Sequence, residues 1–101
     1  MKYLGALRGS GTLASPDESL GAATYEIDGY LTKPGEILAS GELRMAPRDL
    51  ARAFGLRHLL LRTDDGREFT VRFTARKLAS TSSFAHADFG GDLPAAAAWG
   101  H

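Results

Sequence analysis

The chain has no cysteine and only one tryptophan among its 101 residues. The absence of cysteine excludes a disulfide framework, a zinc site built on thiolates and a thiol nucleophile. No apolar run approaches the roughly 20 residues of a membrane-spanning helix. The first nine residues also hold no apolar core of the length found in signal peptides. From these absences we expect a cytoplasmic protein with no contact to a membrane.

Sequence motifs for catalysis and for cofactors are also missing. The chain has no phosphate-binding Gly-x-x-x-x-Gly-Lys and no Gly-x-Ser-x-Gly elbow. Its length allows one modest core, which is too little for separate catalytic and cofactor domains. The apolar fraction of 44% and the charged fraction of 24% are typical of a soluble globular domain. The sequence therefore favours a non-catalytic protein without a cofactor.

The net charge of zero conceals an uneven distribution. The segment from Arg44 to Lys77 carries nine basic and four acidic residues, and the rest of the chain carries an equal excess of acid. A basic segment is typical of a surface for nucleic acid or another acidic partner. Charges on neighbouring strands can also neutralise each other, or two copies can dock basic face against acidic face. We favour neutralisation, between strands or between copies, over a surface for nucleic acid.

Alternating apolar and polar residues predict three strands, over residues 7–14, 21–30 and 36–45. Gly9 and Gly11 share one face of the first strand, which is typical of sharp coiling or of a closely packed neighbour. The connection Lys33–Glu36 has Pro34 and Gly35 at the two central positions of a type II turn. These features together favour an antiparallel arrangement.

A change of period predicts one short helix over residues 47–54, with Pro47 at its first position. Ala46 precedes the proline and offers no oxygen that could cap the helix. We therefore expect Leu50 and Phe54 to hold the helix against the sheet by packing.

The segment from Leu59 to Arg76 predicts a β-hairpin. A three-residue loop, with Gly66 in the left-handed conformation, pairs Leu61 with Phe69 and Arg62 with Glu68. This register gives one apolar face and one face that carries an ion pair. The residues expected inside are Phe69, Val71, Phe73 and Ala75.

The last strand is predicted over residues 82–89, where either of two faces can point inward. We favour the face with Ala85, Ala87 and Phe89 inside, because it leaves the polar side chains in water. These elements define one domain over residues 1–94, followed by an alanine-rich tail over residues 95–101. Trp99 in this tail is expected to dock on an apolar surface of the same chain or of a partner copy.

Two polar clusters are candidates for a metal site. His86, Asp88 and Asp92 could contribute to a divalent site, but no second histidine lies near them in the sequence. The pair Asp64 and Asp65 is better explained as a hairpin turn, because the spacing of a calcium loop is missing. We therefore expect no metal.

Two further functional hypotheses remain open. Arg62, Arg72 and Arg76 could line a basic hairpin face for nucleic acid, although that face has no outward aromatic residue to stack on bases. Small inward residues could leave a cavity in the barrel, for a small ligand or for the substrate of an enzyme, but a barrel of six strands is normally filled by its own side chains. The residues expected to fill it are Tyr25, Phe54, Phe69 and Phe73.

The sequence thus predicts an all-β protein, a small antiparallel barrel or bent sandwich of about six strands with one short helix. The glycine-rich first strand, the short helix, the Asp-Gly hairpin and the closing Gly-Gly-Asp-Leu-Pro resemble those of small bacterial proteins, and this resemblance implies no activity. We expect a binding or assembly module whose partner is a second copy or another protein. Its possible interaction surface comprises Leu38, Leu60, Arg62, Arg72, Arg76 and Trp99.

Overall fold

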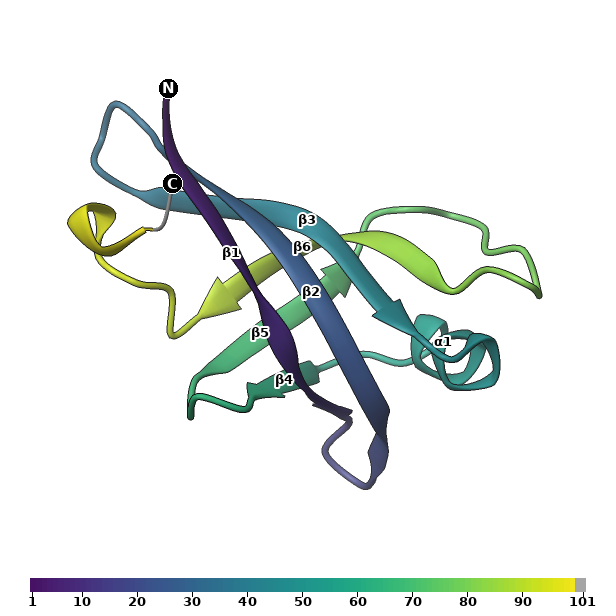
Figure 1. The fold of residues 1–101 in the computed structure, drawn as a ribbon. Helices are drawn as coiled ribbons and strands as arrows, with labels where there is room; N and C mark the ends of the chain where they lie inside the picture. The colour runs from purple at the N-terminus through teal and green to yellow at the C-terminus, as the bar shows by residue number, and fades with distance from the viewer. Residues whose placement is uncertain (100–101) are drawn as a thin grey trace.

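A computed structural model describes residues 1–99, and the six strands in this range close into an antiparallel β-barrel (Figure 1). Around the barrel the strands follow the order β1-β2-β3-β6-β5-β4. They are β1 (Lys2–Ala14), β2 (Ser19–Leu31), β3 (Ile37–Met45), β4 (Leu59–Thr63), β5 (Glu68–Phe73) and β6 (Phe84–Gly91). A helix, α1 (Pro47–Phe54), and a 3-10 turn, η1 (Ala96–Ala98), complete the fold. The predicted fold class is confirmed, as a closed barrel and not a bent sandwich.

β1 is longer than the alternation predicted, because its pairing with β2 already begins at Lys2. A shift of register between Tyr3 and Gly5 interrupts the period of two, so this half of the strand is hidden in the sequence. β4 accompanies β1 only from Gly11 to Ala14. Among the described strands, β2 alone therefore lies beside residues 2–9 of β1, and no other described strand pairs with the second edge of this stretch, which we call the free edge of β1.

The interior of the barrel is filled by apolar side chains from all the strands. The ring of Tyr25 packs against Phe69 with 5.9 Å between the ring centroids. Burial of this kind stabilises a fold by about 25 cal/mol for each Å² of apolar surface. The strand side chains with no exposed surface are Leu13, Ile27, Leu43, Leu61 and Phe69.

The hairpin of β4 and β5 has the predicted register. Leu61 lies opposite Phe69 and Arg62 lies opposite Glu68. Gly66 has a φ of 92°, as the three-residue loop requires.

The connection between β2 and β3 differs from the predicted type II turn. The N–H of Gly35 donates to the carbonyl of Thr32 at 3.0 Å, so Lys33 and Pro34 hold the central positions and Gly35, with a φ of 92°, follows them. The N–H of Thr32 donates to the carbonyl of Glu36 at 2.9 Å, which closes the loop. The β4–β5 loop has the same two backbone hydrogen bonds, so the two loops are of one type. The twist of this loop type matches the twist of the flanking strands.

One of the four residues expected inside the β4–β5 hairpin lies elsewhere, because Ala75 is exposed beyond the end of the strand. β5 ends at Phe73, which packs against the core as predicted but is only partly buried. The pairing of β4 with β5 ends at Leu59 and Val71. The residues of β5 after Val71 therefore have no strand beside them on the β4 side, which leaves them more exposed. The other prediction for this part of the barrel holds, because Ala85, Ala87 and Phe89 of β6 are all buried.

α1 covers one end of the barrel and spans the predicted residues. No side chain caps its amino terminus. Leu50 and Ala53 have no exposed surface and pack into the barrel. Phe54 was expected to pack there fully, but it is partly exposed and lies against Phe73, with 5.3 Å between the ring centroids. Within residues 1–99 no helix has the length and hydropathy to cross a membrane.

The C-terminal segment covers the opposite end of the barrel (Figure 1). Trp99 is 3% exposed, and its indole N–H donates to the carbonyl of Pro94 at 3.1 Å. The ring lies directly over Gly29 of β2, where an added Cβ would stand 2.7 Å from the indole. Of the two docking surfaces considered for Trp99, the structure shows one on the same chain. Residues 100 and 101 of the predicted tail lie outside the described range.

Candidate functional surfaces

The basic face predicted for the hairpin is largely neutralised by ion pairs. Arg62 Nε lies 2.8 Å from Glu68 Oε2, and an Arg72 guanidinium nitrogen lies 3.0 Å from Asp88 Oδ2. Arg76 does not belong to this face, because it follows the end of β5 in the loop toward β6. The structure therefore does not bring the three arginines together as one basic stripe on the hairpin.

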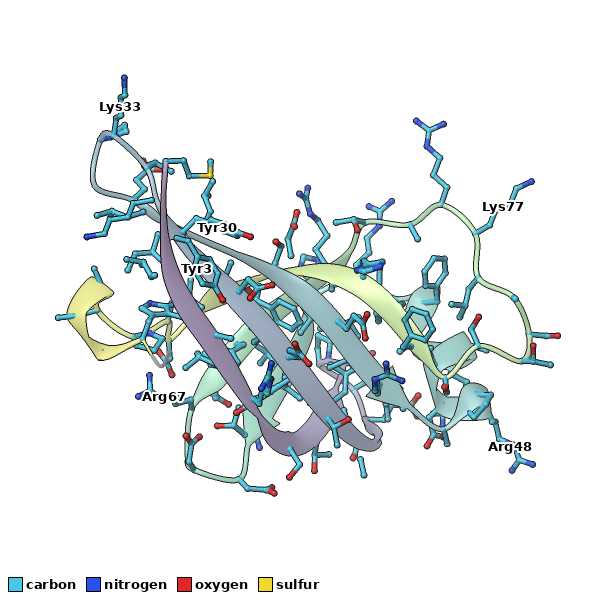
Figure 2. The ribbon with its side chains drawn as sticks, turned by 45° about the horizontal axis from the view of Figure 1, so that its top comes forward. Tyr3, Tyr30, Lys33, Arg48, Arg67 and Lys77 are labelled. Carbon is cyan, nitrogen blue, oxygen red and sulfur yellow. The ribbon has the colours of Figure 1, made fainter. Side chains whose placement is uncertain are left out.

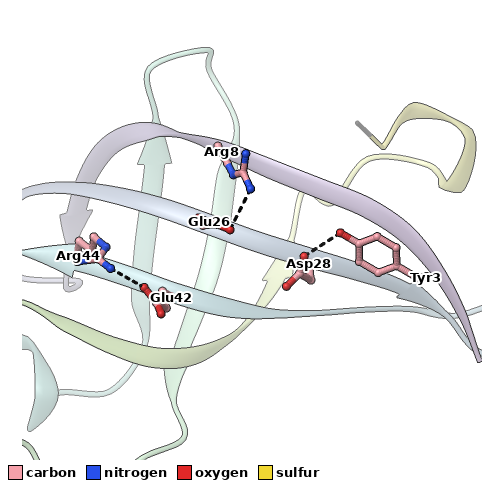
Figure 3. A network of polar contacts seen from close by, with 6 residues as sticks. All are labelled: Tyr3, Arg8, Glu26, Asp28, Glu42 and Arg44. Carbon is pink, nitrogen blue, oxygen red and sulfur yellow. Dashed lines mark hydrogen bonds and ion pairs between the residues drawn. The ribbon is translucent and has the colours of Figure 1, made fainter. Parts of the chain in front are cut away.

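The outer face of β1, β2 and β3 carries a row of satisfied polar groups (Figure 3). Arg8 pairs with Glu26 at 3.1 Å, and Arg44 pairs with Glu42 at the same distance. These pairs are exposed, so each contributes at most about 1 kcal/mol to stability. Their main effect is to cancel the acidic charge that the two adjacent glutamates would otherwise concentrate there.

The cluster considered for a metal is committed to other contacts. Asp88 pairs with Arg72, and the carboxylate of Asp92 accepts the backbone N–H of Glu68 at 3.2 Å. Within residues 1–99 no three histidine or carboxylate groups are arranged to hold a metal ion.

Two tyrosines have a pKa above the ordinary value near 10. The hydroxyl of Tyr3 donates to Asp28 Oδ1 at 3.0 Å, and this hydrogen bond raises the pKa of Tyr3. Burial raises the pKa of Tyr25, with a smaller contribution from the charge of Asp65. In both cases the environment favours the protonated hydroxyl, so neither group is prepared to act as a base near neutral pH.

An apolar patch lies on the outer face beside the free edge of β1. Tyr3 lies opposite Tyr30, and Tyr30 lies opposite Leu38, so the three side chains form a row across β1, β2 and β3. The centroids of the two tyrosine rings are 5.5 Å apart, and both residues are labelled in Figure 2. Tyr3 is 54% exposed, Leu38 48% and the nearby Met1 75%. We call these four residues the outer patch.

Two other residues of the predicted interaction surface lie away from this patch. Leu60 is partly buried and pairs with Thr70, and β6 and β5 separate it from Leu38. Trp99 lies beneath the sheet, against the inward side of Gly29. Of the predicted residues, Leu38 alone belongs to the outer patch.

A second feature lies at the α1 end, where two depressions of about 380 and 400 Å³ are both lined by Phe54. Arg57, His58 and Phe73 line the first, and Arg76 and Lys77 line the second. Figure 2 shows Lys77 on the loop that follows β5, toward the end covered by α1. We call these six residues the α1-end groove.

The α1-end groove differs electrostatically from the rest of the surface. Neither depression has an aspartate or glutamate among its lining residues. The ion pairs found within residues 1–99 involve none of its four basic side chains. The groove therefore gathers Arg57, Arg76 and Lys77, three cations of residues 44–77 that take part in none of these ion pairs.

Sequence reasoning named Leu38 of the outer patch and Arg76 of the α1-end groove, but it missed other residues of both surfaces. Tyr3 was missed because the bulge conceals the first half of β1. Arg57 and His58 were missed because they lie in an irregular connection, where no period indicates a direction for the side chains. The left-handed backbone of His58, with a φ of 60°, has no signal in the sequence either.

The fold and these surfaces define a small, closed β-barrel whose ends are covered by a helix and by the C-terminal segment. No protein-family model matches the chain, and comparison with curated proteins and with solved structures gives no match either.

Proposed function

We propose that the protein is a non-catalytic binding module that assembles with a second copy of itself through the outer patch and the free edge of β1. The observation that supports this most directly is the row formed by Tyr3, Tyr30 and Leu38. A contiguous group of exposed apolar side chains on a small soluble protein usually marks an interface. A cytoplasmic location belongs to the same proposal and is supported by the lack of cysteine.

The free edge of β1 favours a second copy as the partner. An edge strand offers unpaired N–H and C=O groups to another strand. If β1 pairs in antiparallel fashion with β1 of a second copy, each copy contributes the same residues, as a two-fold dimer requires. This pairing extends the sheet next to Tyr3 and brings the two outer patches to one continuous surface.

The charges around this edge are compatible with such a dimer. The net charge of zero produces no long-range repulsion between copies. Arg8 already has an ionic partner within its own chain, so it would not be left as an unpaired charge in the interface. The bulge between Tyr3 and Gly5 limits the pairing to a short stretch, which favours a closed dimer over open-ended association.

The test is the oligomeric state of the full chain, measured by sedimentation equilibrium over a wide range of concentration. We expect a dimer, and we expect the variant Tyr3→Lys/Leu38→Lys to raise its Kd at least about tenfold, since central apolar residues often contribute more than 1 kcal/mol to an interface. The control is Phe84→Lys, which introduces a charge at a ring that is 42% exposed and outside the patch. A monomer at every concentration contradicts the proposal, as does equal weakening by the control.

A further inference from the structure

We infer that the α1-end groove binds a nucleotide, that is, a flat aromatic base that carries phosphate, either free or within a single-stranded nucleic acid. This site lies at the end of the barrel covered by α1, whereas the outer patch lies beside the amino-terminal half of β1. The inference does not depend on the proposed assembly.

The charge of the groove supports an anionic ligand. Arg57 and His58 line one depression, and Arg76 and Lys77 line the other. All four are exposed, and no ion pair within residues 1–99 engages them. Arg72 also lines the first depression, but its ion pair with Asp88 neutralises its charge, so we do not include it among the four basic groups. Several basic groups without a carboxylate between them favour a ligand with more than one negative charge, such as a phosphate.

The aromatic pair in the floor supports a flat ring as the second part of the ligand. Phe54 and Phe73 lie 5.3 Å apart and remain partly exposed, although both are large apolar residues at the border of a core. Bases of nucleic acids stack on such rings without regard to their sequence. An acidic peptide would satisfy the basic rim, but acidic side chains have no flat ring to place on this floor. A nucleotide uses both parts of the groove.

The backbone at His58 is the third observation. Its φ of 60° lies in the left-handed region, and His58 is the only residue other than glycine within residues 1–99 with a positive φ. Such a conformation is unfavourable for a residue with a side chain, and conformations of this kind cluster at binding sites. The strained residue here lines the depression that holds Phe73.

The first experiment measures binding of the full chain to a fluorescent oligothymidylate of about twelve nucleotides, within the usual footprint of small barrels, by anisotropy at low salt. We expect Arg57→Gln/Arg76→Gln to weaken binding at least tenfold and to flatten the slope of log K against log[salt] by about 1.4, since each phosphate contact contributes about 0.7. The matched control is Arg62→Gln/Arg67→Gln, which removes the same charge from the β4–β5 hairpin, outside both depressions, and should leave binding nearly unchanged. No binding at low salt, or a loss with the control as large as that in the groove variant, overturns the inference.

The second experiment tests the aromatic floor and the source of the nucleotide. Phe73→Leu should weaken binding of the oligonucleotide between about fivefold and a hundredfold. In the unmodified protein, NMR should show shifts at the rings of Phe54, Phe73 and His58 on addition of adenosine monophosphate or oligothymidylate, which keeps the test valid if Phe73→Leu does not fold. Saturable binding of the monophosphate identifies a free nucleotide, and binding of the oligomer alone identifies single-stranded nucleic acid. If polyglutamate binds as tightly and shifts the same rings, the inference is wrong.

Discussion

Two glycines show how closely neighbouring strands approach each other in this barrel. A Cβ added at Gly11 would lie 2.2 Å from the carbonyl oxygen of Arg62, and one at Gly41 would lie 2.0 Å from that of Glu26. Residues 11–16 and 41–47 also share a weak sequence pattern that begins with these glycines. The glycine at the start of the pattern has the same physical cause in both strands, because a side chain there would collide with the backbone of the neighbouring strand.

The contrast between Gly41 and Gly55 gives a prediction at the residue scale. Gly41→Ala should lower the free energy of unfolding by about 1–3 kcal/mol, since a backbone carbonyl cannot move away as a flexible side chain can. Gly55 has a φ of −89° and no atom within 4 Å of an added Cβ. Gly55→Ala should therefore raise the free energy of unfolding by about 0.4–1 kcal/mol, because it restricts the unfolded chain. Urea denaturation of both variants measures the difference, and equal effects would contradict this explanation.

Single residues could be assigned to the inside or outside wherever the period of two was intact. In β6 the period left two faces open, and Ala85 and Phe89 were placed correctly because only that choice kept the polar side chains in water. Phe73 was assigned to the correct face, but its partial exposure depends on where β4 begins, and the alternation within β5 contains no information about β4. The outer patch was only partly found, because Leu38 lies in a regular strand and Tyr3 lies beside a bulge.

At the scale of the element, the register of the β4–β5 hairpin could be predicted because the loop length and the alternation in its two strands indicate the same pairing. The three-residue loop pairs apolar with apolar residues and Arg62 with Glu68, and any shift by one would pair unlike side chains. The β2–β3 loop was assigned wrongly because Pro34 and Gly35 fit two turn types. The turn type is set by the hydrogen bonds that join the flanking strands, and the four turn residues alone do not determine it.

The uncapped start of α1 gives a prediction at the element scale. Ala46 precedes the helix with a φ of −54° and a ψ of 139°, is exposed, and offers no side-chain acceptor to the helical N–H groups. Ala46→Ser supplies that acceptor and should raise the free energy of unfolding by about 1 kcal/mol. Ala51→Ser, on the exposed surface within the same helix, serves as the control and should not stabilise. Thermal unfolding of both variants decides whether the gain comes from capping.

At the scale of the whole molecule, the fold class followed from the sequence, but the neighbours around the barrel did not. Periodicity gives each strand its inward face, yet it does not say that β1 pairs with β4 or β3 with β6. The α1-end groove depends on the same information, because it joins Phe54 and Arg57 to Phe73 and Lys77 from a later part of the chain. Closure of the barrel brings these segments together, so the groove could be recognised only in three dimensions.

The last prediction concerns the C-terminal segment as a structural part of the barrel. Trp99 is 3% exposed and covers Gly29, so Trp99→Ala should lower the free energy of unfolding by about 3–5 kcal/mol, as expected for a buried tryptophan. Trp99→Phe keeps a ring there but loses the hydrogen bond to Pro94, and its effect should be smaller, with about 1 kcal/mol of it from that bond. Ala97→Ser, at an exposed position of η1, serves as the control and should change stability little. The three variants can be compared by urea denaturation. If Trp99→Ala left stability unchanged and altered only the oligomeric state, Trp99 would belong to an interface between copies and not to the barrel.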